Sequence, residues 1–278
     1  MAFYLHYLVF APLFLFALFA LTLPGHNPIR VFLDGLNGLR THAGGKWLLG
    51  CFLFVTGTNL IQAVYDQRIT AWLGWDFSAK VHAVEGALIE NVQNWVLGLP
   101  GGWHLTALLA IAYTAGYVAW LLYPSFALFA INKPRAAGTY AVAFAMNYLL
   151  ALPFYLFFPV QEVAWSGLSR ARPLLEEHWP GITEKLRLES ALDNCFPSLH
   201  VSIAVTAMYF VAVYGTRRMR LVGWPLTIAI CASVMVLAIH WGIDTAAGVP
   251  FGLICTQIAI KLYPPDSSDK PVATESRG

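Results

Sequence analysis

The chain has 278 residues, of which 58% are hydrophobic and 12% are charged, and its formal net charge is +2. Soluble domains carry roughly 25% charged residues, so this composition excludes an ordinary soluble domain and favours an all-α, multi-pass membrane protein. No basic run is long enough to predict nucleic-acid binding, and the four cysteines form no spaced pair that would predict a disulfide framework.

Apolar runs of spanning length recur along the chain and predict a polytopic helix bundle of about six to seven transmembrane helices. They form one membrane domain over residues 1–263, followed by a polar tail at 264–278 that we expect to be disordered. The fourth run contains Pro153, which should kink or break its helix. The expected spans are 4–23, 46–65, 103–131, 139–160, 197–214, 221–240 and 245–262.

The stretch at about 66–97 differs from these runs. Apolar residues such as Val81, Val84 and Leu88 recur at three- and four-residue intervals between charged ones. This periodicity predicts an amphipathic helix. We expect it to lie along the membrane interface with its tryptophans at headgroup level; a protein-facing lid is the alternative.

Seven spans would create two sets of loops, and the basic residues divide unevenly between them. The loops at 24–46, 132–138 and 215–221, with the tail and the end of the span before it, carry 11 of the 17 basic residues. The positive-inside rule therefore places these loops and the C-terminus in the cytoplasm. We expect a plasma membrane protein, prokaryotic by its short loops, with the polar motifs of the C-terminal half on the extracytoplasmic face. The 11 residues are Arg30, Arg40, Lys46, Lys133, Arg135, Arg217, Arg218, Arg220, Lys261, Lys270 and Arg277.

The run from Asn194 to Ser202 begins one of the predicted spans and carries the strongest functional signal. Pro197 and Ser198 are typical of a helix start, which places His200 in the first turn. The backbone N–H groups of a first turn lack helical partners and favour an anion. We therefore expect a phosphate-handling site, with Ser198, Pro197 and Asn194 next to the phosphate.

A second polar cluster, His240 and Asp244, follows 40 residues after His200. Two spans of ~20 residues, each crossing ~30 Å of hydrocarbon, return the chain to its starting face. His200 and His240 should therefore meet at one level. A spacing of four places His240 and Asp244 on one side of a helix. The carboxylate would orient His240 as a nucleophile, and His200 would act as general acid; a structural pair or a helix cap is the alternative.

These residues resemble a known family. Phe196-Pro197-Ser198-Leu199-His200, followed by His240-x-x-x-Asp244 and Gly248, is similar to the motifs of the type 2 phosphatidic acid phosphatase (PAP2) superfamily. With Cys195 in front, the first motif resembles the branch that contains inositol phosphorylceramide synthases and sphingomyelin synthases. The resemblance implies a six-helix core, and we place the PAP2-like core at about 104–262.

The resemblance also implies roles for the catalytic residues. His240 would carry a phosphohistidine intermediate, His200 would donate the proton and Asp244 would orient His240, in agreement with the roles reasoned from spacing. No metal and no other cofactor is implied. We assign no catalytic role to Cys195, although it adjoins the motif.

The chain departs from the phosphatases of that superfamily, which usually carry Lys-x6-Arg-Pro upstream and Ser-Arg before the second histidine. Here Val234 follows Ser233, and Trp165 stands where the lysine would precede Arg172-Pro173. The missing cations argue against an ordinary phosphatase and favour the phosphotransferase branch. Arg170 and Arg172 are candidates to bind the phosphate instead; ordinary loop charges are the alternative.

The sequence thus predicts a membrane lipid phosphotransferase. It would move a phosphorylated headgroup, such as inositol phosphate, from a phospholipid donor to a lipid or polyol acceptor. A lipid phosphate phosphatase acting on a phosphomonoester or pyrophosphate is the alternative in the same class. Outside that class, His200, His240 and Asp244 would form a metal site of two histidines and one carboxylate, or the cluster would bind the substrate of a transporter. The sequence identifies neither donor, acceptor nor oligomeric state.

Overall fold

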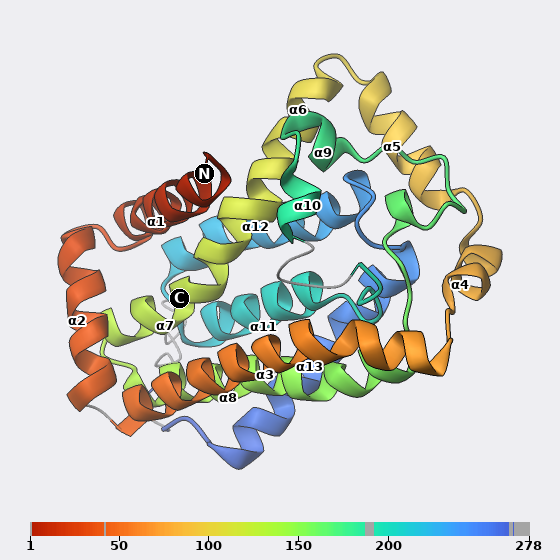
Figure 1. Ribbon diagram of the computed structural model, residues 1–278. Helices are drawn as coiled ribbons and strands as arrows, with labels where there is room; N and C mark the ends of the chain where they lie inside the picture. Colours follow the sequence, from red (N-terminus) through yellow and green to blue (C-terminus); the bar gives the residue numbers. More distant parts are fainter. Residues whose placement is uncertain (1, 42, 187–191, 267–268, 270–278) are drawn as a thin grey trace, which may run out of the picture.

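The computed structural model describes residues 2–41, 43–186, 192–266 and 269, and within them every regular element is a helix. The predicted all-α fold is confirmed (Figure 1). The elements are α1 (Ala2–Thr22), α2 (Pro28–Thr41), α3 (Ala43–Leu73), α4 (Ser78–Glu85), α5 (Leu88–Gly98), α6 (Gly102–Ile111), the π-helix η1 (Ala112–Gly116), α7 (Tyr117–Ala130), α8 (Pro134–Phe157), the 3-10 helix η2 (Val163–Trp165), α9 (Leu174–His178), α10 (Ile182–Leu186), α11 (Leu199–Tyr214), α12 (Arg217–Val236) and α13 (Gly242–Leu262).

Within the described residues, four helices are long and apolar enough to cross a bilayer. They are the continuous α6–η1–α7 rod, α8, α12 and α13, and they coincide with four of the predicted spans. Two shorter apolar helices, Val9–Thr22 and α11, match two more. The predicted span at 46–65 lies inside α3, which is not among these six. An α-helix is stable in the hydrocarbon core of a bilayer because its backbone polar groups are paired within the helix itself.

Helix α11 forms the centre of the bundle. It packs against α7, α8, α12 and α13, and Figure 1 shows it surrounded by these longer helices. Its side chains Ile203 and Phe210 are fully buried in the main apolar core. The polar motif at the N-terminus of α11 is therefore held by helices on several sides.

The amphipathic helix predicted at about 66–97 is not continuous. Helix α3 ends at Leu73, and α4 and α5 follow as separate short helices. Gly74 and Gly86, with φ of 64° and 61°, separate them. A glycine with left-handed backbone angles commonly ends a helix. The three- and four-residue spacing of apolar residues does not reveal where such a helix end occurs. Trp72 and Trp95 are exposed, as the interfacial interpretation requires.

The structure corrects two further predictions, the break at Pro153 and part of the disordered tail. Helix α8 runs through Pro153 to Phe157 without a break, because neighbouring helices can compensate for the lost hydrogen bond of a proline in an apolar helix. In the predicted disordered tail, Asp269 is buried and its carboxylate accepts the backbone N–H of Ala136 at 3.0 Å. Arg187, Lys270, Arg277 and the remainder of the tail from 270 lie outside the described residues.

Glycines on α13 allow it to approach α11 closely. A Cβ on Gly248 would lie 2.8 Å from the Ser198 carbonyl oxygen and 2.9 Å from Val201 Cβ. Gly252 lies equally tightly against the Ser202 backbone. Small residues at helix crossings allow such backbone contact, and here it sets the distance between the first turns of α11 and α13.

We predict that Gly248→Ala forces these two helices apart. Overpacking of this kind costs about 1–3 kcal/mol, so the midpoint of thermal unfolding in detergent should fall by several degrees. The matched control is Gly50→Ala on α3, where the added Cβ meets nothing within 4 Å. There the better helix propensity of alanine should leave stability unchanged or slightly raised. Equal behaviour of the two variants would contradict the close-packing interpretation.

Candidate active site

The first motif forms the N-terminus of α11 as expected. Ser198 is the N-cap residue with an extended backbone, and its hydroxyl accepts the backbone N–H of Val201 at 3.4 Å. His200 lies in the first turn. The carbonyl oxygen of Pro197 accepts the hydroxyl of Tyr155 at 3.1 Å, which ties this helix start to α8.

The second motif is a turn followed by a helix start. Ala238, with φ of 58°, lies in the turn after α12, and Trp241 caps α13. The Asp244 Oδ2 accepts the backbone N–H of Trp241 at 3.0 Å. His240 therefore stands in the turn between α12 and α13, and the helical-spacing argument for its contact with Asp244 does not apply. The Asp244 carboxylate caps α13, the helix that carries it, and also lies beside the His240 imidazole.

The two motifs meet directly. The rings of His200 and His240 lie 5.7 Å apart between centroids. His240 Nδ1 lies 3.7 Å from Asp244 Oδ2, and the Ser198 N–H donates to the carbonyl oxygen of Asp244 at 3.2 Å. Both His240 and Asp244 are buried. The structure thus brings the three predicted catalytic residues together at one level of the bundle.

Two tyrosines that the sequence analysis missed enclose His200. The rings of Tyr113 and Tyr117 lie 4.6 Å and 4.5 Å from the imidazole, centroid to centroid. They come from the π-helix η1 and the first residue of α7. Such one-turn π-helices occur often at functional sites. Inside an apolar run these tyrosines look like ordinary core residues, so no sequence pattern distinguishes them.

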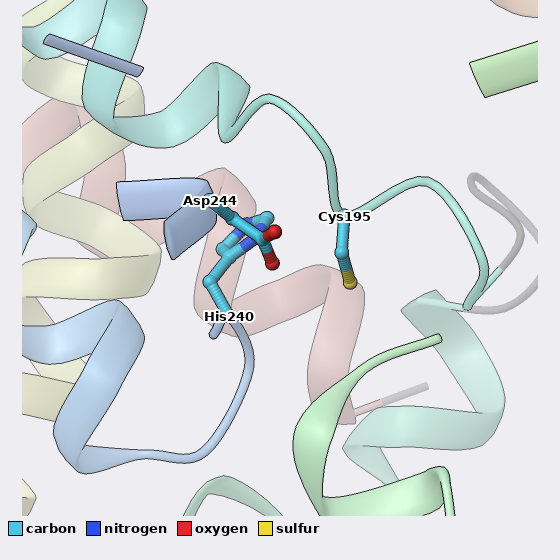
Figure 2. A group of neighbouring side chains, drawn as sticks. All are labelled: Cys195, His240 and Asp244. Atoms are coloured by element: carbon cyan, nitrogen blue, oxygen red, sulfur yellow. The ribbon is translucent and has the colours of Figure 1, made fainter. Parts of the chain in front are cut away.

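Cys195 also reaches the site. Figure 2 shows its side chain beside His240 and Asp244, and one potential ligand atom of each lies within 4.8 Å of the other two. Among the described residues, Cys195 and not His200 completes this group. The metal set proposed from the sequence, with two histidines and one carboxylate, is therefore not the group that converges here.

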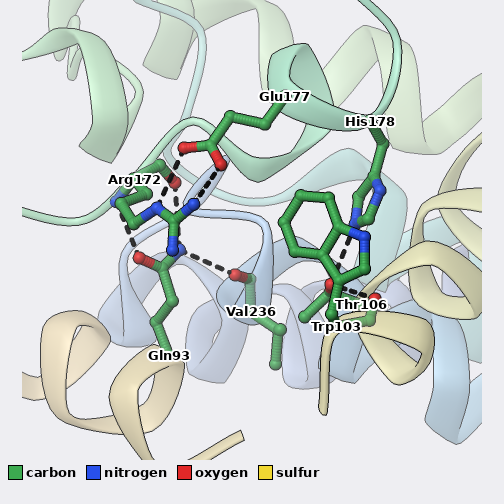
Figure 3. Close-up of polar contacts among 7 residues, drawn as sticks. All are labelled: Gln93, Trp103, Thr106, Arg172, Glu177, His178 and Val236. Atoms are coloured by element: carbon green, nitrogen blue, oxygen red, sulfur yellow. Dashed lines mark hydrogen bonds and ion pairs between the residues drawn. The ribbon is translucent and has the colours of Figure 1, made fainter. Parts of the chain in front are cut away.

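Of the two arginines predicted to bind phosphate, Arg172 has its guanidinium engaged elsewhere, and Arg170 is held through its backbone. The guanidinium of Arg172 forms an ion pair with Glu177, with Nε 3.0 Å from Oε1 (Figure 3). The backbone N–H of Arg170 donates to Glu90 Oε1 at 2.7 Å. This bond keeps the pKa of the Glu90 carboxyl below its ordinary value. Asn194 forms an isolated parallel bridge with Val160, next to Cys195.

Gln93 on α5 joins this segment to the turn that carries His240. Its Oε1 accepts the Arg172 N–H at 2.7 Å, and its Nε2 donates to the carbonyl oxygens of Arg172 and Val236 at 2.9 Å and 3.0 Å (Figure 3). Val236 is the last residue of α12. Gln93 is only 2% exposed, and its bond to the Val236 carbonyl is buried, whereas its two bonds to Arg172 are part-buried.

A second contact holds the same segment nearby. The Nε2 of His178 lies 2.8 Å from the Thr106 hydroxyl, and its ring packs on Trp103 at 4.1 Å (Figure 3). Burial lowers the pKa of His178, an effect that the carboxylate of Glu177 partly opposes. The imidazole is therefore held neutral where α9 meets α6.

We predict that Gln93→Ala destabilises the protein, because it leaves the buried Val236 carbonyl and two part-buried backbone groups of Arg172 without their partner. Each such loss costs ≈ 1–3 kcal/mol, and hydrogen exchange should rise at Arg172 and at the amides of the turn after Val236. Asn94→Ala is the matched control, since Asn94 is exposed on the same helix. Unchanged exchange in the Gln93 variant would contradict the proposed connection.

Comparison with known protein families places both motifs within one family. A family model described as the PAP2 superfamily matches residues 79–258. Neither the curated proteins nor the solved structures gave a match. The matched region extends from α4 into α13 and includes both motifs. The chain therefore belongs to the PAP2 superfamily, whose members are membrane enzymes of the phosphatase and phosphotransferase type.

Proposed function

We propose that this protein is a lipid phosphotransferase that moves a phosphorylated headgroup, such as inositol phosphate, from a phospholipid to an alcohol acceptor. The observation that carries the proposal is the buried contact of His240 with Asp244, next to His200 at the start of α11. Buried ionisable groups in a membrane bundle are costly and usually functional.

In the first step, His240 Nε2 attacks phosphorus and the bond to the diacylglycerol oxygen breaks. His200 gives its proton to that leaving oxygen. Asp244 faces the other ring nitrogen, Nδ1, and stabilises the imidazolium that forms. The separation of 3.7 Å is longer than a hydrogen bond, and catalytic hydrogen bonds are often long until substrate binds.

In the second step, the acceptor alcohol attacks the phosphohistidine. His200, now neutral, takes the proton of that alcohol, and the bond between phosphorus and His240 Nε2 breaks. The cycle returns both histidines to their starting protonation. Phosphate oxygens would be held by the Ser198 hydroxyl and the backbone N–H groups at the start of α11, where the helix dipole favours negative charge.

The choice of transfer over hydrolysis rests on two features. The run Cys195 to His200 resembles the inositol phosphorylceramide and sphingomyelin synthase branch, and Val234 occupies the position of the phosphatase arginine. Val234 is fully buried, and its carbonyl oxygen accepts the backbone N–H of His240 at 3.0 Å. Asp244 and His240 are also enclosed, which supports exclusion of water from the intermediate.

The orientation in the membrane is part of the proposal. Arg217, Arg218 and Arg220 lie at the start of α12, at the end of the α11–α12 hairpin away from the histidines. By the positive-inside rule this end is cytoplasmic. The site would then act on the extracytoplasmic leaflet of a plasma membrane.

The test supplies purified protein with phospholipids labelled in the headgroup phosphate, with and without a ceramide, diacylglycerol or polyol acceptor. We expect label to appear in a new phosphodiester only when an acceptor is present. Acceptor-independent release of free phosphate from a phosphomonoester lipid, or of the phosphorylated headgroup from a phosphodiester lipid, would instead identify a hydrolase. His240→Ala should reduce transfer at least a thousandfold, whereas His104→Ala, on α6 outside the site, should retain activity. Full activity of the His240 variant would contradict the mechanism.

A further inference from the structure

The cluster of Cys195, His240 and Asp244 has a composition that the proposed reaction does not explain. The three residues come from the loop before α11, the turn after α12 and the first turn of α13. Their potential ligand atoms lie within 4.8 Å of one another, and the residues are 2%, 4% and 0% exposed. The phosphotransfer mechanism uses the histidine and the carboxylate but leaves the thiol without a role.

The polar atoms of this cluster are poorly satisfied. His240 Nδ1 and Asp244 Oδ1 are buried and form no hydrogen bond within the described residues. The thiol of Cys195 has a long contact of 3.6 Å with the carbonyl oxygen of Ile239. Leaving a buried polar atom without a partner carries a free-energy cost. A ligand that bonds to all three side chains would remove that cost.

The donor set selects the chemistry of such a ligand. Thiolate, imidazole and carboxylate together are ligands of Zn²⁺, at about 2.3 Å for sulfur and about 2.0–2.2 Å for nitrogen and oxygen. Ligand atoms in a tetrahedral site of that size stand roughly 3.3–3.8 Å apart. The 3.7 Å between His240 Nδ1 and Asp244 Oδ2 already fits, and the longest separation of 4.8 Å needs to close by about 1 Å.

We propose that Cys195, His240 and Asp244 form an inhibitory Zn²⁺ site. Binding replaces the proton of the Cys195 thiol with the metal, and the released proton goes to solvent. Three protein ligands leave the fourth position of the tetrahedron to water. The loops that carry the residues, one of which contains Ala238 at positive φ, are the parts that would move to close the site.

The inhibitory effect rests on the proposed function of His240. A neutral imidazole that binds metal through Nδ1 carries its proton on Nε2. The lone pair that would attack phosphorus is then unavailable. Zn²⁺ also occupies the Asp244 carboxylate that would otherwise stabilise the imidazolium. The metal therefore competes with catalysis, although the ion lies on the side of the ring away from the phosphate.

The binding test uses the purified full-length protein and Co²⁺ as a spectroscopic probe. Wild-type protein should show a near-ultraviolet thiolate-to-cobalt charge-transfer band that one equivalent of Zn²⁺ abolishes. Cys195→Ser should lose the band. Cys231→Ser, which removes another free cysteine on α12, should keep it. No band in the wild-type protein, or a band that persists in Cys195→Ser, would overturn the site.

A second measurement does not depend on any variant. X-ray absorption at the zinc edge of the loaded wild-type protein should show one sulfur neighbour at about 2.3 Å. A shell of only nitrogen and oxygen neighbours would overturn the site even if the Cys195 variant failed to fold.

The activity test separates the site from the proposed function. Zn²⁺ should inhibit wild-type transfer, and Cys195→Ser should need at least tenfold more Zn²⁺ for the same fractional inhibition, each measured against its own activity without metal. A cobalt band without inhibition would overturn the inhibitory role. Absence of the band, together with inactivity of His240→Ala, would overturn the metal site and leave the phosphotransferase standing.

Discussion

The hydrogen bond from the Ser198 N–H to the Asp244 carbonyl oxygen, 3.2 Å long, connects the two halves of the candidate site. It joins the first turns of α11 and α13, which are separated along the chain by all of α12. The bond can form because Gly248 lets the backbones of the two helices approach. In an apolar bundle a backbone donor without a partner is expensive, so this contact fixes the register of α11 against α13. The positions of His200, His240 and Asp244 all follow from it.

The α11–α12 hairpin, and the meeting of His200 with His240 that results from it, were predictable from the sequence. Pro197 and Ser198 mark a helix start through their backbone chemistry, and a return distance of 40 residues follows from helix rise and bilayer thickness. The local geometry of His240 was not predictable, because α12 ends at Val236 and Asp244 caps α13 through the Trp241 N–H, which leaves His240 in the turn between the two helices. Tertiary packing alone placed Tyr113 and Tyr117 around His200. The breaks at Gly74 and Gly86 depend on single backbone angles that hydrophobic periodicity does not report.

The site offers an anion few formal charges. Val234, at the arginine position of the phosphatase pattern, is buried in the bundle, and Ser233 bonds back to the Ile230 carbonyl oxygen within α12. Arg172, a predicted substitute, is held by Glu177. Under the proposed function, the attraction for phosphate would come from the start of α11 and from the two histidines. A site of this kind binds a phosphodiester, with its single negative charge, more readily than a doubly charged phosphomonoester, which is consistent with transfer of a headgroup between alcohols.

The central claim is that His240 carries the phosphoryl group between donor and acceptor. The most direct measurement is rapid quenching at alkaline pH after mixing the protein with donor lipid labelled in its headgroup phosphate, in the absence of acceptor. We expect a covalent adduct that mass spectrometry assigns to His240, that is stable in base and lost in acid, and that disappears when acceptor is added before the quench. Label on another residue, or turnover with no adduct on His240 at any quench time, would contradict the account.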